Sequence, residues 1–269
     1  MVVWNDDGNG YVLQVTTPSW PGAGSKNFPR ASDGNTLGCV QDNNVKVSQH
    51  FFALRLTKDD LTKVIKALQN ASVVTDVKNP QLVNNGGPSD VQALVKTLGV
   101  KSDSKEVTKD ELSTGVILVS KPSALNVPPW QMLSAVLDGT PLRSATWWAS
   151  PQIYSSTAST NISCWEDSLR KPGAVEIATT GQWEQQIFGL TGGPSTNNNH
   201  AKIGISTSGD HFYAIFGDLN QQGTVAGSNC ASSQNGRGGL FYVVDDRTLH
   251  DAVANLIKGD TAPTRAPAK

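Results

Sequence analysis

The sequence has 269 residues, of which 38% are hydrophobic and 17% are charged, and its formal net charge is −1. This composition excludes a disordered chain, and the length suits one large domain or two small ones packed together. The near-zero charge provides no basic surface for nucleic acid at neutral pH, but acid would charge the four histidines and neutralise some of the 23 carboxylates.

The N-terminal part of the chain predicts a β-hairpin followed by a long loop. Residues 2–4 and 11–16 flank a turn rich in Asn and Gly, which supply the positive backbone angles of tight hairpin turns. A polar loop then extends to about residue 44, and residues 51–56 predict a strand. No secretory signal precedes the hairpin, and no apolar run is long enough to span a bilayer, so we expect no membrane segment and leave the compartment open.

Four later segments predict amphipathic helices, each with a start signal. The starts are Thr57 with Asp60 near the N3 position, Ser89, Pro128-Pro129, and Asp245 or Asp246. Further strands are predicted at residues 115–119, 145–149, 175–179, 201–206, 212–216 and 240–244. This order indicates an α/β or α+β fold in which helices cover a large sheet. Residues 259–269 predict a disordered tail.

The three cysteines, Cys39, Cys164 and Cys230, form no Cys-x-x-Cys pair. The sequence therefore predicts no zinc site, and it leaves open whether one disulfide forms and which pair would form it. We expect no metal and no cofactor.

The strongest chemical signal is the pair His200 and Lys202 at the start of a predicted strand. Side chains alternate between the faces of a strand, so His200, Lys202 and Gly204 are expected on one face, with Gly204 leaving room for a ligand. An imidazole can attack phosphorus or move protons, and a lysine can hold a phosphate oxygen. The alternative is an exposed strand pair without function, because His-x-Lys is frequent by chance.

The residues after this pair strengthen the chemical interpretation. Residues 217–220 read Gly-Asp-Leu-Asn, which resembles the Gly-Ser-x-Asn of the phospholipase D superfamily with Asp in place of Ser. The closer resemblance is to the deoxyribonuclease II family, a branch of that superfamily. It also includes the Gly-rich residues 236–239, the strand region 47–52, and residues 10–21, whose Thr-Pro-Ser-Trp-Pro is similar to a loop of the family.

The resemblance implies a two-lobed, phospholipase D-like fold and a metal-independent acid endonuclease that hydrolyses double-stranded DNA. On this basis residues 1–125 are the remnant of a first lobe, residues 126–258 are the second lobe, and residues 259–269 are the tail. His200 is expected as nucleophile or general acid, and Lys202 as phosphate clamp. The expected substrate-binding residues are Asn220, Gly217, Asp218, Ser19 and Thr17. The family suggests a secreted or lysosomal, acidic compartment.

One departure from the family weakens the expected activity. Each lobe of the family contributes one His-x-Lys, whereas in this sequence only His200 is followed two residues later by lysine. We therefore expect an incomplete first lobe and weak or no activity. The explanations are a truncated or mis-started product, a second chain or homodimer that supplies the missing half, and a non-catalytic descendant.

Two other functions stay open: a non-catalytic nucleic-acid-binding homologue, and a phosphodiesterase for another substrate, such as a phospholipid. The other histidines have simpler interpretations, with His50 expected to be structural and His211 and His250 exposed at the surface. Trp147 and Trp148 are expected in the core more than in base stacking.

Overall fold

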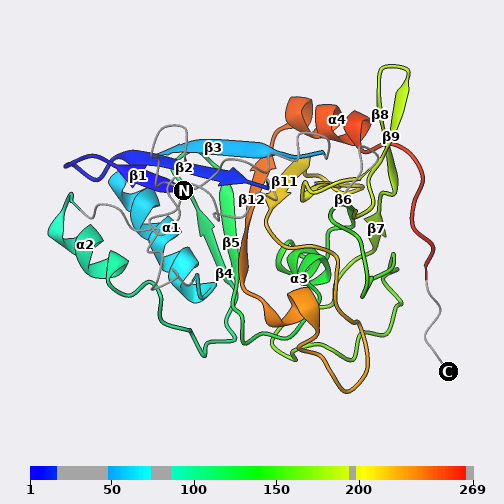
Figure 1. Cartoon of the computed structure of the whole chain (residues 1–269), viewed down its shortest axis with the longest axis horizontal. Coiled ribbons are helices and arrows are strands. Elements are labelled where there is room, and N and C mark those ends of the chain that lie inside the picture. Colours follow the sequence, from blue (N-terminus) through cyan, green and yellow to red (C-terminus); the bar gives the residue numbers. More distant parts are fainter. Residues whose placement is uncertain (17–47, 74–85, 194–197, 265–269) are drawn as a thin grey trace, which may run out of the picture.

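The computed structural model describes residues 1–16, 48–73, 86–193 and 198–264 (Figure 1). Its mixture of helices and sheets agrees with the predicted α+β class. Three strands form a small antiparallel sheet in the order β1-β2-β3. These strands are β1 (Val2–Trp4), β2 (Gly10–Val15) and β3 (Phe51–Leu56). They confirm the predicted hairpin and the strand that follows it.

A seven-stranded sheet forms the centre of the molecule, in the order β4-β5-β12-β11-β10-β6-β7. All neighbours in it are antiparallel except β6 and β7. Its strands are β4 (Thr108–Glu111), β5 (Ile117–Lys121), β12 (Gly239–Asp245), β11 (Tyr213–Gly217), β10 (Ile203–Ser206), β6 (Leu142–Ala145) and β7 (Val175–Ile177). A hairpin of β8 (Thr180–Trp183) and β9 (Gln186–Gly189) lies beside helix α4 (Figure 1).

The helices are α1 (Lys58–Asn70), α2 (Ser89–Val95), α3 (Pro129–Val136) and α4 (Arg247–Leu256), with a 3-10 turn η1 (Ser233–Gly236). The predicted caps at Thr57 and Asp246 are confirmed, and Thr57 forms a full capping box with Asp60. The predicted cap at Ser89 is wrong by one residue, because Pro88 precedes α2 and makes no side-chain capping bond.

Side-chain alternation along the large sheet divides the core into two layers. Leu118 and Tyr242 belong to the apolar cluster around α1, whereas Val119 and Phe241 belong to the cluster around α3. Phe52 of the small sheet stacks on Phe216 and contacts Tyr242, with ring centroids 5.0 and 4.9 Å apart. The small sheet therefore packs on the same face of the large sheet as α1. The end of β2 and the start of β3 lie at the start of β10.

Three predictions need correction. The strand predicted at residues 145–149 lies at Leu142–Ala145, because the chain leaves the sheet after Ala145. Strands β4, β8 and β9 were not predicted, since their polar sequences lack an apolar alternation. Residues 259–264 do not form a disordered tail: Ala262 is buried, and Arg143 donates hydrogen bonds to Gly259 and Asp260 carbonyls. Residues 265–269 lie outside the described residues.

The large sheet contains strands from both predicted lobes, because β5 pairs directly with β12 and β4 pairs with β5. The sequence left open which cysteines pair, and in the structure Cys164 and Cys230 form a disulfide. Cys39 lies outside the described residues. In the part of the chain that the structure describes, no helix is long and apolar enough to cross a membrane.

Lys121 at the end of β5 is fully buried, and its ammonium holds several turns together. Its Nζ donates to the carbonyl oxygens of Leu125, Asn235 and Arg237 at 2.6, 2.7 and 2.9 Å, and to that of Pro122 at 3.3 Å. Burial lowers the pKa of Lys121 to about 7. One donor group thus satisfies the carbonyls of two separate segments, the turn after β5 and the turn before β12.

We predict that Lys121→Met lowers the free energy of unfolding by about 2–3 kcal/mol, because the four carbonyls lose their shared donor in a buried place. Chemical denaturation at pH 6 would measure this. Lys105→Met is the matched control, since Lys105 is 59% exposed in its ion pair with Glu166 and should cost less than about 1 kcal/mol. Equal effects of the two substitutions would contradict the structural role of Lys121.

Candidate active site

The predicted pair His200 and Lys202 lies where the small sheet meets the start of β10. The main-chain nitrogens of His200 and Ala201 both donate to the carbonyl of Ser48, at 2.8 and 3.0 Å, and Ser48 N donates to Asn198 O. These bonds attach the segment before β10 to the segment before β3. His200 is consequently held against Thr16, the residue after β2.

The His200 ring has a defined orientation. Its Nδ1 is in very close contact with the carbonyl oxygen of Thr16, and its ring lies edge to face against Trp147 with centroids 4.9 Å apart. A carbonyl oxygen only accepts hydrogen bonds, so the closer of the two contacts of Nδ1 favours a proton on this nitrogen, against the donor-only ammonium of Lys202 3.2 Å away. In the neutral ring the lone pair is therefore on Nε2.

Lys202 is only 4% exposed, and its ammonium is turned toward His200. Its Nζ donates to the carbonyl oxygen of His200 and lies 3.2 Å from His200 Nδ1. Burial lowers the pKa of Lys202 to about 7, against the opposing attraction of Asp218. Burial, followed by the Lys202 charge, lowers the pKa of His200 to about 4. The structure thus confirms that the two side chains converge.

Asp218 is the third titratable group of this cluster. The amide of Gly217 donates to the carbonyl of Lys202 at 2.8 Å, which places Asp218 beside Lys202 on the neighbouring strand end. Asp218 Oδ1 accepts a hydrogen bond from Leu240 N at 2.9 Å. Asp218 is an exposed residue, but desolvation of its carboxylate raises its pKa to about 6.

His50 belongs to the same cluster, although the sequence predicts only a structural role for it. It is buried, and its Nδ1 accepts the Lys202 main-chain N–H at 3.2 Å. The acceptor role of Nδ1 places the ring proton on Nε2, which lies 3.3 Å from Gln14 Oε1. Burial, followed by the Lys202 charge, lowers the pKa of His50 to about 4. The contact between His50 and Lys202 forms because the start of β3 lies against the start of β10. No motif within either segment predicts it.

The predicted helper Asn220 lies on the loop after β11, and its side chain is engaged elsewhere. Its Nδ2 donates to Gln222 Oε1 at 2.9 Å, and its main-chain N donates to Gln234 Oε1 at 3.3 Å. Within the described residues its buried Oδ1 has no hydrogen-bond partner. The predicted residues Thr17 and Ser19 lie outside the described residues.

The expected room beside Gly204 is a wrong prediction. A Cβ at Gly204 would lie 2.5 Å from Trp130 of α3, so the indole and not a ligand fills this space. Gly204 lies within β10, whereas Lys202 precedes the strand and is not bound to its alternation. Only two of the three residues expected on one face therefore meet.

Of the remaining predictions, those for Trp148 and His211 are confirmed and those for Trp147 and His250 are wrong. Trp148 is buried in the core as expected, but Trp147 packs on His200. His211 is exposed and lies 2.7 Å from Asp245. His250 is wrong as an exposed residue, because its side chain is only 14% exposed and its Nε2 lies 2.9 Å from the carbonyl oxygen of Ser206.

Comparison with models of known families finds no match for this sequence, and comparison with curated proteins finds no significant similarity. Among the residues that the structure describes, no group of three His, Cys, Asp or Glu side chains is arranged to hold a metal ion. The candidate active site is therefore defined by its geometry: His200, Lys202 and Asp218, supported by His50 and Thr16.

The hydrogen bond of His50 generates a prediction on stability. We expect His50→Leu to cost about 1–3 kcal/mol at pH 7, because the Lys202 N–H then stays buried without an acceptor. His50→Asn should recover most of this loss, since its side-chain oxygen is placed to accept the same N–H. Chemical denaturation of both variants would measure the difference, and a Leu variant as stable as the Asn variant would contradict it.

His50 also predicts how stability depends on pH. Its pKa is about 4 in the folded protein, below the 6.5 of a free histidine, so unfolding takes up a proton between these values. His50 therefore lowers the stability of the fold as the pH falls from 6.5 toward 4. His50→Asn should reduce the slope of unfolding free energy against pH in this window by up to one proton. An unchanged slope would show that His50 titrates normally.

Proposed function

We propose that this protein is a metal-independent phosphodiesterase that acts on DNA in acid, of the deoxyribonuclease II type, with a two-lobed, phospholipase D-like fold. The observation that supports it best is the convergence of His200 and Lys202, with the two nitrogens 3.2 Å apart at the junction of the two sheets. A helix-covered mixed sheet is consistent with the proposed fold. The neighbouring Asp218 and Gly217 belong to the motif from which the function is inferred.

The geometry supports His200 as the nucleophile. With its Nδ1 proton directed at Thr16, the Nε2 lone pair is available to attack phosphorus, forming an N–P bond while the P–O bond to the leaving oxygen breaks. The pKa of about 4 keeps the ring neutral in mild acid, where a free histidine would be mostly protonated. Lys202, with a pKa of about 7, is charged at the same pH and would stabilise the negative phosphate oxygens.

A complete reaction also needs a proton for the leaving oxygen of DNA. His50 does not meet this need, because it is buried and both of its ring nitrogens are engaged. These 269 residues contain one His-x-Lys, so they do not supply a second donor of that kind. We therefore expect the 269-residue polypeptide alone to cleave DNA weakly or not at all.

The function is tested with a substrate that needs no leaving-group proton. Thymidine 5′-(p-nitrophenyl phosphate) releases p-nitrophenolate, a stable anion, so one histidine and one lysine should suffice. We predict p-nitrophenol release at pH 5 in EDTA, reduced about 100-fold or more by His200→Ala. His211→Ala is the matched control, since His211 is exposed and outside the cluster.

The result that would contradict the proposal is equal release by wild type and His200→Ala, or none by either. Plasmid nicking under the same conditions tests whether the polypeptide alone can protonate the leaving oxygen of DNA. Robust nicking by the polypeptide alone would contradict the expectation that it lacks a proton donor, without affecting the role of His200.

The two pKa values predict a pH window. Activity toward the nitrophenyl ester should rise above pH 4 as His200 loses its proton, and fall above pH 7 as Lys202 loses its charge. Lys202→Arg should move the alkaline limb upward, because a guanidinium stays charged. A rate that keeps rising to pH 9 in the wild type would show that the Lys202 charge is not used.

A further inference from the structure

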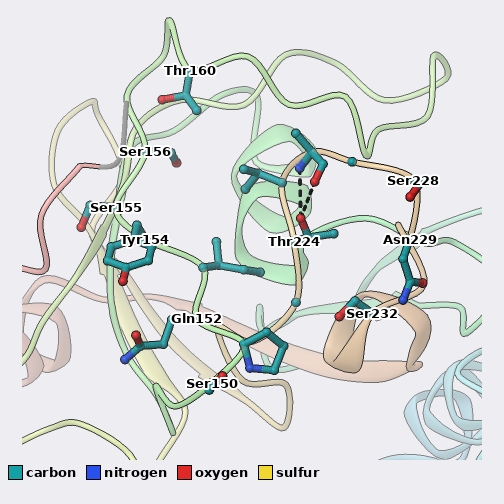
Figure 2. A pocket seen from close by; sticks show the side chains of 16 residues that line it. Ser150, Gln152, Tyr154, Ser155, Ser156, Thr160, Thr224, Ser228, Asn229 and Ser232 are labelled. Carbon is teal, nitrogen blue, oxygen red and sulfur yellow. Dashed lines mark hydrogen bonds between the residues drawn. The ribbon is translucent and has the colours of Figure 1, made fainter. Parts of the chain in front are cut away.

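A separate cavity lies next to the loop that carries Asn220. It has a volume of about 610 Å³, within the range of small-molecule sites, and lies between residues 150–160 and residues 223–232 (Figure 2). Neither His200 nor Lys202 lines it. Figure 2 shows Gln152, Tyr154 and Ser156 along one wall and Ser228, Asn229 and Ser232 along the other.

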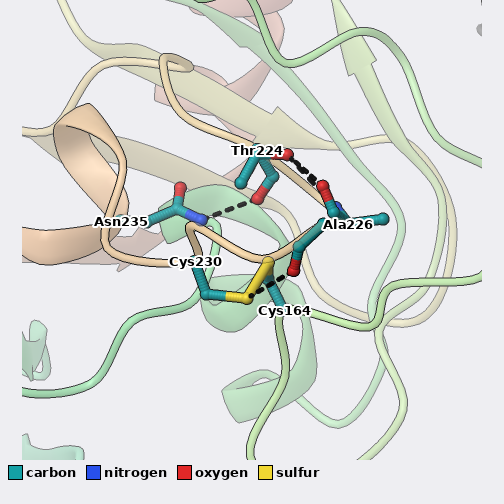
Figure 3. The surroundings of a disulfide bond; sticks show 6 residues. Cys164, Thr224, Ala226, Cys230 and Asn235 are labelled. Carbon is teal, nitrogen blue, oxygen red and sulfur yellow. Dashed lines mark hydrogen bonds between the residues drawn. A yellow bond between two sulfur atoms is a disulfide. The ribbon is translucent and has the colours of Figure 1, made fainter.

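The wall formed by residues 223–232 is held in place by covalent and polar contacts. The disulfide joins Cys230 to Cys164 (Figure 3). Cys164 N donates to Val225 O at 3.0 Å. Asn235 Nδ2 donates to Thr224 O at 2.6 Å. The cavity is therefore formed before a ligand arrives, which lowers the entropic cost of binding.

The chemistry of the lining is polar but uncharged. No Asp, Glu, Lys, Arg or His is among the residues that surround the cavity, and Pro151, Ile153 and Val225 add apolar surface. Within the part of the chain that the structure describes, the side chains of Ser228, Asn229 and Ser232 make no hydrogen bond to other residues. Such a lining suits a neutral ligand with flat apolar faces and hydrogen-bonding edges, and it offers no positive charge to a phosphate.

A short path of hydrogen bonds connects the rim of the cavity to Asn220, which follows Asp218 of the candidate active site by two residues. Asn220 Nδ2 donates to Gln222 Oε1, and Gln222 Nε2 donates to the carbonyl of Ser150 at 3.3 Å. Gly223 N donates to Pro151 O at 2.8 Å, so the two walls are paired at the end nearest Asn220. The loop after β11 thus leads from Asp218 to the rim of the cavity.

From these observations we propose that the cavity binds a nucleoside unit of the DNA strand adjacent to the phosphate attacked by His200. This inference rests on the proposed function and adds its substrate subsite. A nucleobase has apolar faces and amide-like edges that match Asn229 and Gln152, and its uncharged nature matches a lining without ions. The phosphate is recognised by Lys202, whereas the base is recognised here.

The test uses deoxynucleosides without phosphate, followed by NMR of the side-chain amides of Asn229 and Gln152. We expect saturable binding of at least one of thymidine, deoxyadenosine, deoxycytidine and deoxyguanosine, with a Kd on the order of 1 mM. The double variant Asn229→Leu/Ser232→Ala should weaken it at least about fivefold. Ser208→Ala, an exposed serine on the β10–β11 turn, is the matched control.

His200→Ala should bind the nucleosides as tightly as the wild type, so this measurement does not depend on catalysis. Loss of nitrophenol release without loss of nucleoside binding, or the reverse, separates the failure of one proposal from that of the other. Absence of saturation, equal binding by the double variant with an unchanged melting temperature, or equally tight binding of maltose or of inorganic phosphate would overturn the nucleoside site.

Discussion

The contact between the Thr16 carbonyl and the His200 ring is the constraint on which the candidate active site depends. It connects the end of the small sheet to the start of β10, so the imidazole is positioned by two sheets rather than by one strand. Because a carbonyl accepts but never donates, the contact also selects the tautomer. The same main-chain oxygen therefore determines where the ring lies and which nitrogen carries the lone pair, with Trp147 closing its other side.

Burial then gives the two key groups different charges at the same pH. Removal from water favours the neutral form of both, yet their ordinary pKa values differ so much that the lowered values, about 4 for His200 and about 7 for Lys202, leave a window between them. The protonation of Asp218 also affects the net charge of the site. Its pKa is raised to about 6, so in mild acid it loses the negative charge that would otherwise neutralise Lys202. A protein of net charge −1 thereby acquires a local cation, which in the proposed function binds the phosphate.

The sequence predicts what depends on local rules. The capping box at Thr57, the Pro start of α3 and most strands follow from patterns within a few residues, and the His-x-Lys pair is visible as a motif. Contacts between distant segments were not predictable. His50 reaches the site because β3 meets β10. Asp218, which the resemblance did place at the site, lies beside Lys202 because β11 pairs with β10. The error at Gly204 has the same origin: alternation applies inside a strand, and Lys202 lies before it.

The Gly-rich turn before β12 lies between the candidate active site and helix α1, and both neighbours leave no room for a side chain. A Cβ at Gly239 would lie 2.3 Å from Asp218 Oδ1, and a Cβ at Gly238 would lie 1.9 Å from the carbonyl oxygen of Ala71 after α1. The turn passes between the end of α1 and the Asp218 carboxylate, and only glycine fits at positions 238 and 239. Lys121 fixes the same turn by donating hydrogen bonds to the carbonyl oxygens of Asn235 and Arg237. The glycines at positions 238 and 239 are therefore explained by close approach, because a bulkier residue at position 239 would displace the carboxylate that balances Lys202.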